Sequence, residues 1–75
     1  MTKYIVIEVA DREINHIVYD NLDKAKTALY ALYDEVCVKH RLDRDDDYEC
    51  WIDDDNTIAY ANGKNCQFDW TIIEA

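Results

Sequence analysis

The sequence predicts an α+β fold in which a mostly antiparallel sheet packs on one long helix, in the order ββαβββ. Two observations favour this fold. Apolar residues recur at three- and four-residue steps in one stretch only, residues 20–41, and short β-branched or alternating stretches lie on both sides of it. A sheet with one face buried under a helix is a stable two-layer arrangement. We therefore expect one domain, residues 1–75.

Two strands are expected before the helix. Residues 3–10 (KYIVIEVA) are rich in β-branched side chains, and alternation places Ile5, Ile7 and Val9 on the face expected to meet the helix. After a polar break, residues 14–19 (INHIVY) are expected to return as the second strand of a hairpin. Both alternate sets of this strand contain apolar residues, so its inward face is left open.

The helix is expected over residues 20–41. Asp20 is a suitable N-cap, and Asp23 lies in the electropositive first turn. Basic residues follow at the electronegative end, at positions 39–41. The residues predicted to form the buried stripe of this helix are Leu22, Ala25, Leu29, Leu32 and Val36, and Tyr33 and His40 are expected to widen it.

Three further strands are expected after the helix. Asn62-Gly63 is the strongest hairpin signal in the chain, because a type I′ turn needs positive φ at both central residues. The expected strands are residues 48–52, 57–61 and 65–74, with polar segments at 42–47 and 53–56. The sheet face away from the helix would be open to water or to a partner, and the residues expected on it are Tyr4, Val6, Trp51 and Ile73.

Acidic residues dominate the charge of the chain, whose formal net charge is −9. The thirteen residues 43–55 hold eight acidic side chains and one cation, Arg44, and so account for −7 of that total. This balance disfavours direct binding of nucleic acid or anionic membranes and favours a basic protein as partner. The acidic residues are Asp43, Asp45, Asp46, Asp47, Glu49, Asp53, Asp54 and Asp55.

Two interpretations of these acidic clusters remain open. They can be solvated loops that keep a small protein soluble. They can also form a surface that competes for a phosphate-binding channel, because duplex DNA carries a charge about every 1.7 Å and carboxylates on a rigid sheet can meet the same Lys and Arg side chains.

Metal binding is a weaker interpretation. Asp43, Asp45 and Asp47 match the start of a calcium-binding loop, but Tyr48 stands where that loop needs glycine, and its twelfth position is Asp54 instead of glutamate. Cys37, His40, Cys50 and Cys66 could be assembled into a zinc site, but the chain has no Cys-x-x-Cys pair, and free cysteine is commonly a small core residue. We expect no metal and no cofactor.

An enzyme is not expected either. Cys37 and His40 are a nominal nucleophile–base pair, yet one glycine in the whole chain leaves little means of building an oxyanion-stabilising loop. No apolar run approaches the roughly 20 residues of a membrane span, and neither a signal-peptide pattern nor an even cysteine count points to export. The expected location is the cytoplasm.

In size, acidity and layout, with no proline and no catalytic motif, the chain resembles small phage-encoded inhibitors of the anti-CRISPR and anti-restriction type. The resemblance implies a protein of the bacterial host cytoplasm that occupies the basic nucleic-acid site of a CRISPR effector or restriction enzyme. The eight acidic residues and Trp51 would make the contacts. The alternative is a small structural or regulatory protein–protein module, with a homodimer formed through the open sheet face as one form of it.

Overall fold

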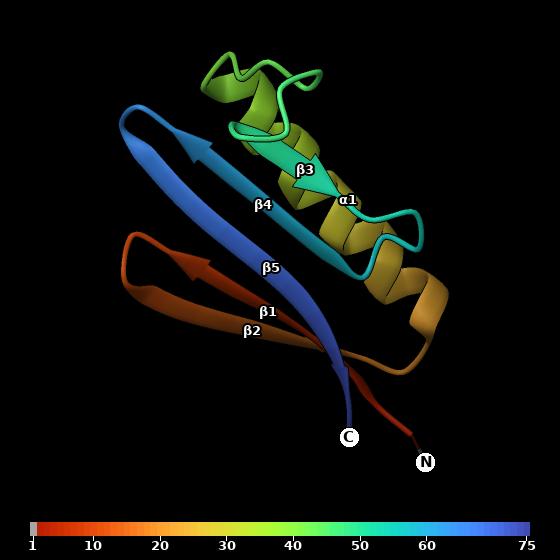
Figure 1. Ribbon diagram of the computed structural model, residues 1–75. Coiled ribbons are helices and arrows are strands. Elements are labelled where there is room, and N and C mark those ends of the chain that lie inside the picture. Colours follow the sequence, from red (N-terminus) through yellow and green to blue (C-terminus); the bar gives the residue numbers. More distant parts are fainter. Residues whose placement is uncertain (1) are drawn as a thin grey trace.

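The computed structural model describes residues 2–75 and confirms the α+β fold and the order ββαβββ (Figure 1). Met1, which the expected domain includes, lies outside the described residues. The elements are β1 (Tyr4–Ala10), β2 (Glu13–Tyr19), α1 (Leu22–Lys39), β3 (Cys50–Ile52), β4 (Ile58–Gly63) and β5 (Cys66–Glu74). No helix within residues 2–75 combines the length and the apolar character needed to cross a bilayer.

The five strands form one antiparallel sheet in the order β2-β1-β5-β4-β3. The nine-residue β5 is the central strand and joins the two hairpins, so the first and last strands of the chain are neighbours. Helix α1 packs on one face of this sheet, and β2 and β3 lie at opposite margins (Figure 1). Within residues 2–75, the other face carries no helix.

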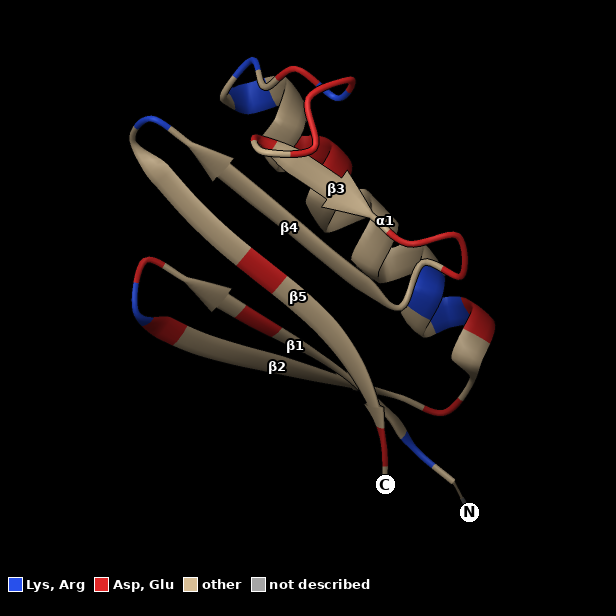
Figure 2. Cartoon of the chain, in the orientation of Figure 1, with Lys and Arg blue, Asp and Glu red and all other residues tan. Residues whose placement is uncertain are grey.

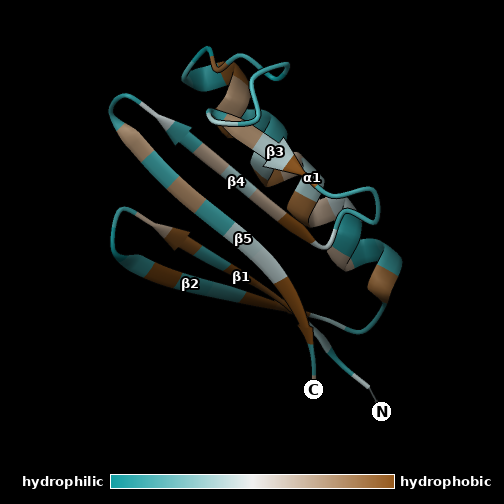
Figure 3. Cartoon of the chain, viewed as in Figure 1, coloured by the Kyte–Doolittle hydropathy of each residue, from teal (hydrophilic) through white to brown (hydrophobic). Residues whose placement is uncertain are grey.

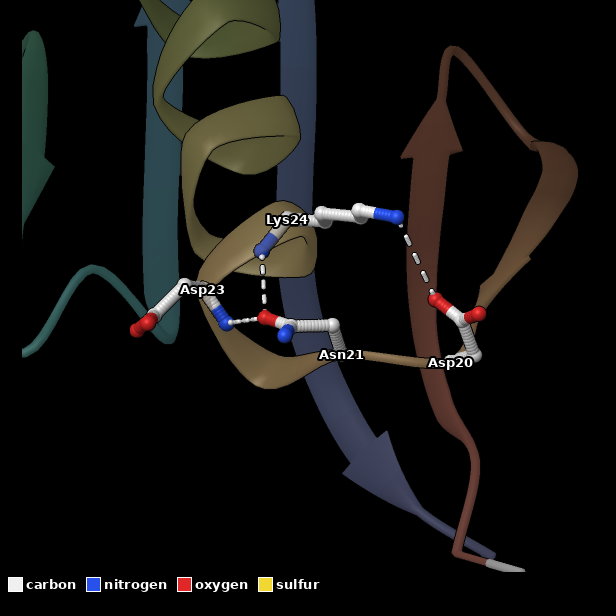
Figure 4. A network of polar contacts seen from close by, with 4 residues as sticks. All are labelled: Asp20, Asn21, Asp23 and Lys24. Atoms are coloured by element: carbon white, nitrogen blue, oxygen red, sulfur yellow. Dashed lines mark hydrogen bonds and ion pairs between the residues drawn. The ribbon is translucent and has the colours of Figure 1, made fainter.

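The first turn of α1 is capped by Asn21 and not by Asp20, so the predicted N-cap was wrong by one residue (Figure 4). The Oδ1 atom of Asn21 accepts hydrogen bonds from the backbone N–H groups of Asp23 at 2.7 Å and Lys24 at 3.2 Å. Asp20 instead forms an ion pair with Lys24 at 3.6 Å. Asp and Asn both suit an N-cap, and the choice between them depends on the residue at which the helical backbone begins.

The buried face of α1 is shifted toward the aromatic and thiol side of the predicted stripe. Leu29 and Ala25 are fully buried as expected, and Val38 is 66% exposed. Tyr33 is buried as expected and Cys37 is buried as well, whereas Leu32 is only partly buried and His40 is exposed, contrary to the prediction. The shift follows from Trp70, whose ring meets Tyr33 edge-on at 6.2 Å between centroids and draws that side of the helix onto the sheet.

Strand β1 faces opposite to the prediction. Val6 is 1% exposed and belongs to the core, so the row at even positions meets the helix and the row of Ile5, Ile7 and Val9 lies on the open face. The strand register gives the reason: Glu8 lies opposite Trp70, and the Trp70 Nε1–H donates to Glu8 Oε2 at 2.7 Å. A carboxylate can lie on the helix side of the sheet when it accepts the hydrogen bond of a buried indole N–H.

The turn between β4 and β5 differs from the prediction, and positive φ occurs in a different hairpin turn. Positive φ at two consecutive residues occurs in the turn between β1 and β2, at Asp11 (49°) and Arg12 (78°). Gly63 is the last residue of β4, and the turn to β5 falls two residues later than predicted, at residues 64–65, so the predicted Asn62-Gly63 turn was wrong. Gly63 is needed for space: a Cβ there would lie 2.8 Å from Cys66 Sγ and from a methyl group of Leu42.

Strand β3 is shorter than predicted, because the chain still turns at Tyr48 and Glu49. In the predicted strand 48–52, alternation with Trp51 would place Tyr48 on the inward face, but its side chain is 91% exposed. Cys50 and Ile52 do face the helix, and Trp51 lies on the open face as predicted. The expected position of Ile73 is also confirmed, whereas Tyr4 and Val6 lie on the helix side.

Candidate partner-binding surface

The eight acidic residues of positions 43–55 lie in two loops, one before and one after β3. Figure 2 shows red segments at both ends of this strand, along the margin of the sheet that β3 forms. We call these eight side chains the acidic rim. Because β3 has only three residues, at about 3.3 Å each, the two loops begin about 10 Å apart.

The first loop uses three of its carboxylates to fix its own backbone. Asp43 Oδ1 accepts from the Asp45 N–H at 2.9 Å, and Asp46 Oδ1 accepts from the Tyr48 N–H at 2.9 Å. The carboxylate of Glu49 accepts from the Asp43 N–H at 2.7 Å and closes the loop. These are local side-chain-to-backbone contacts of the kind that stabilise turns, so the three residues have a structural role.

The second loop is fixed in the same way by Asp53. Its Oδ1 accepts from the backbone N–H groups of Thr57 at 2.7 Å and Ile58 at 3.2 Å, and its Oδ2 accepts from the Thr57 hydroxyl at 2.7 Å. Partial burial alone would raise the pKa of Asp53, but these hydrogen bonds stabilise the charged form, and the net effect lowers the pKa.

The other four rim carboxylates, on Asp45, Asp47, Asp54 and Asp55, are exposed, and none accepts a hydrogen bond from residues 2–75. The one cation of the segment, Arg44, is turned away from them. Its guanidinium pairs with Asp34 of α1 and lies 5.8 Å from the centre of the Tyr33 ring. The four exposed carboxylates are therefore free to meet an external cation.

Trp51 lies beside the rim on the open sheet face. It is 38% exposed and stacks on Tyr60 of the neighbouring strand, with 6.0 Å between ring centroids. The Tyr60 hydroxyl donates to the backbone carbonyl of Asp47, which ties the aromatic pair to the first loop. The structure thus brings the predicted contact residue Trp51 next to the acidic side chains.

The cysteines do not form the arrangement that zinc would need. Within residues 2–75 no three His, Cys, Asp or Glu side chains are placed to share a metal ion. Cys37 and Cys50 are buried near Tyr33, whereas Cys66 lies against Gly63 at the far hairpin. The thiols that the structure brings together fill the core.

Cys37 is also unsuited to act as a nucleophile. Burial, together with the neighbouring Cys50, raises the pKa of its thiol from 9.0 to about 11. A reactive cysteine needs the opposite shift. His40, the nominal base, is exposed and lies 6.0 Å from the Phe68 ring instead.

One surface was missed by the sequence interpretation: the apolar character of the open face continues into β2. Ile14 is 72% exposed and Val18 is 51% exposed, on the same face as Ile58 at 50%. Brown segments in Figure 3 follow β1 and β2 to the margin of the sheet. The signal in the sequence was the even apolar content of both rows of residues 14–19, which is typical of a strand with two usable faces.

No protein-family model matches this chain, and no curated protein or solved structure matches it either.

Proposed function

We propose that this protein binds a basic nucleic-acid-binding protein through its acidic rim and so occupies the site where that protein holds phosphates. The target class that we propose is a bacterial defence enzyme, a CRISPR effector or a restriction enzyme, in the cytoplasm of the host. The protein acts by binding and not by catalysis.

The observation that carries this proposal is that some carboxylates of the rim hold the loop backbone in place and the others are exposed. Asp43, Asp46, Glu49 and Asp53 hold the loops in shape, and this leaves four exposed carboxylates on a pre-formed backbone. Ordering a loop on binding costs free energy, and a loop already fixed by its own hydrogen bonds avoids much of that cost. A purely solubilising cluster would not need this fixed geometry.

The spacing of the rim also supports the proposal. A separation of about 10 Å between the two loops corresponds to the rise of about three base pairs along the axis of a DNA duplex. Lys and Arg side chains that track a phosphate backbone can therefore reach both loops at once. Trp51 adds an aromatic contact beside the charges, and aromatic residues at the centre of an interface commonly contribute much of its affinity.

The test uses displacement of a fluorescent DNA duplex from guide-loaded CRISPR effectors and from restriction enzymes at low salt. The rim variant is Asp45→Asn, Asp47→Asn, Asp54→Asn and Asp55→Asn, and the matched control neutralises four exposed acids away from the rim, Glu13→Gln, Asp23→Asn, Glu35→Gln and Glu74→Gln. Both variants change the formal net charge from −9 to −5.

The unmodified chain and the control variant are expected to release the duplex from at least one of these enzymes, with the rim variant at least tenfold weaker. Equal activity of the two variants would show that net charge alone is responsible and would contradict the proposal. So would the absence of displacement across the panel.

A second candidate is a protein–protein module that uses the open sheet face. The observation that favours it is the exposure of Trp51, Ile58 and Ile73 on one face without a covering helix. Here Trp51→Ala would abolish association, whereas the rim variant would bind its partner normally.

A further inference from the structure

We propose that β2 is the edge at which two copies of this chain associate. The two β2 strands pair antiparallel about a two-fold axis at His16, so that the two sheets become one continuous ten-stranded sheet. This inference is independent of the acidic rim, which lies at the opposite margin.

The backbone of β2 has unpaired groups along its outer side. Lys3 and Ala75 exchange two hydrogen bonds of 2.9 Å, so odd-numbered residues of β1 direct their N–H and C=O groups toward β5. Even-numbered residues of β1 then bond to β2, where their partners are residues 13, 15, 17 and 19. Ile14, His16 and Val18 are left with N–H and C=O groups that point away from the sheet.

Strand β2 has few of the features that protect sheet edges. It has seven residues in unbroken register with β1 and contains no Lys, Arg or Pro and no bulge, and its one acidic residue, Glu13, is at its first position. The other edge is protected: β3 has three residues, acidic loops flank it, and the Cys50 N–H already donates to the Asp46 carbonyl. Of the two edges of the described sheet, β2 is the longer and the less protected.

The sequence of β2 complements itself in the proposed register. Centring the axis on His16 places Ile14 opposite Val18 of the second copy and Asn15 opposite Ile17. All three residues with outward backbone groups then face one another, as an antiparallel ladder requires. The axis is perpendicular to the sheet, so both open faces lie on one side of the dimer and both helices lie on the other.

The charges around β2 favour a second copy of this chain over other partners at this edge. Continuing the register by one residue places Arg12 beside Asp20 of the second copy, an opposite-charge contact that the symmetry repeats. The acidic rim is four strand spacings away, about 19 Å, which exceeds the screening length of about 8 Å at physiological salt. Two chains of net charge −9 can therefore approach at β2 without bringing their rims together.

Pairing also covers apolar surface that is exposed in the single chain. Ile14 and Val18 lie on the open face, and Ile17, which is 49% exposed, lies on the helix side. Beside Ile17 a hollow of about 50 Å³ runs between β2 and Leu32 of α1. The second strand would cover these side chains on both faces of the sheet.

A charge-swap experiment tests both the edge and the register. In the proposed dimer His16 faces its own copy, so His16→Lys and His16→Glu each place like charges opposite one another. Each variant alone is expected to sediment as a monomer of 8.9 kDa, and an equimolar mixture is expected to restore a species of twice that mass. The controls, Val38→Lys and Val38→Glu on the exposed side of α1, are expected to remain dimeric.

A wild-type chain that stays monomeric at millimolar concentration would overturn the proposal, and so would a dimer that survives both His16 substitutions. A dimer lost in Trp51→Ala but kept in the His16 variants would assign the contact to the open face instead.

Amide hydrogen exchange on the wild-type chain gives a test without substitutions. The N–H groups of Ile14, His16 and Val18 are expected to become protected as concentration rises, and fast exchange of all three in a dimeric sample would contradict the pairing.

Discussion

Glu8 and Trp70 lie opposite each other on β1 and β5, and the indole N–H of Trp70 donates to the Glu8 carboxylate at 2.7 Å. Trp70 is 2% exposed, so this carboxylate satisfies a polar group that water does not reach. The contact also fixes which face of β1 meets the helix, because Glu8 must lie on the side of the buried ring.

Glu8→Ala is expected to lower the free energy of unfolding by about 1–3 kcal/mol, because it leaves the buried Trp70 N–H without an acceptor. Glu8→Gln keeps an oxygen at the same distance along the side chain and is expected to cost less. Urea denaturation of the three proteins measures the difference. Equal stability of the alanine and glutamine variants would show that the hydrogen bond does not contribute.

Asp53→Ala is expected to destabilise the fold by about 1–3 kcal/mol, because it removes three hydrogen bonds that hold the turn into β4. Asp54→Ala, at the exposed neighbouring position, is the matched control and is expected to change stability little. Thermal melts at pH 7 compare the two. If both substitutions have the same effect, Asp53 does not have the structural role that its contacts indicate.

The same residue predicts a dependence on acid. The pKa of Asp53 is lowered below its ordinary 3.8, so the folded chain binds a proton less readily than the unfolded chain. The contribution of Asp53 to stability is therefore complete above pH 3.8 and is lost as the pH falls through its folded pKa. Stability measured from pH 5 to pH 2 should fall less steeply in Asp53→Asn than in the wild type.

Alkaline pH is expected to act on the core through Cys37 and Tyr33. Burial, with the neighbouring Cys50 thiol, raises the pKa of Tyr33, and it raises that of Cys37 from 9.0 to about 11. The folded state therefore holds both protons more tightly than the unfolded state. Its stability should be fully present below pH 9 and should decline as the pH rises toward 11.

Equilibrium unfolding at several pH values checks this decline. Cys37→Ala is expected to reduce the slope between pH 9 and pH 11, although it also lowers stability at neutral pH. Cys66→Ala removes another buried thiol and leaves the Cys37–Tyr33 pair intact, so it should keep the wild-type slope. A slope that is the same in all three proteins would contradict the assignment.

The helix core gives a further prediction. Leu29 is fully buried, and Leu29→Ala is expected to cost about 2–5 kcal/mol, a large part of the stability of so small a domain. Val38 is 66% exposed, and Val38→Ala is expected to cost little. Thermal melts that show equal losses at the two positions would contradict the orientation of α1.

The sequence predicted which helices and strands form better than it predicted which face of each strand meets the helix. The alternation of β5 was clear because Cys66, Trp70 and their row are apolar and the opposite row is polar except for Ile73. Strand β1 has apolar residues in both rows, and the choice between them depends on Trp70, which lies 62 residues from Glu8 in the chain. Periodicity within one strand does not contain that contact.

The site was predicted in composition but not in the roles of its residues. Local hydrogen bonds such as Asp43 to the Asp45 N–H follow a familiar two-residue pattern and could have been anticipated from the aspartate spacing. The bond from the Asp43 N–H to Glu49 depends on how the whole loop closes. The charge of the rim could therefore be predicted from the sequence. The structure is needed to separate the carboxylates that form the turns from those that are exposed.

The most direct test of the rim as a binding surface is the association rate constant with the enzyme that the wild type displaces from DNA, measured at 50 mM and 300 mM salt. Exposed charges steer association and are screened by salt. The rim variant is expected to associate at least tenfold more slowly than the control variant at 50 mM and to differ little from it at 300 mM. A rim variant that associates as fast as the control at 50 mM would contradict the account.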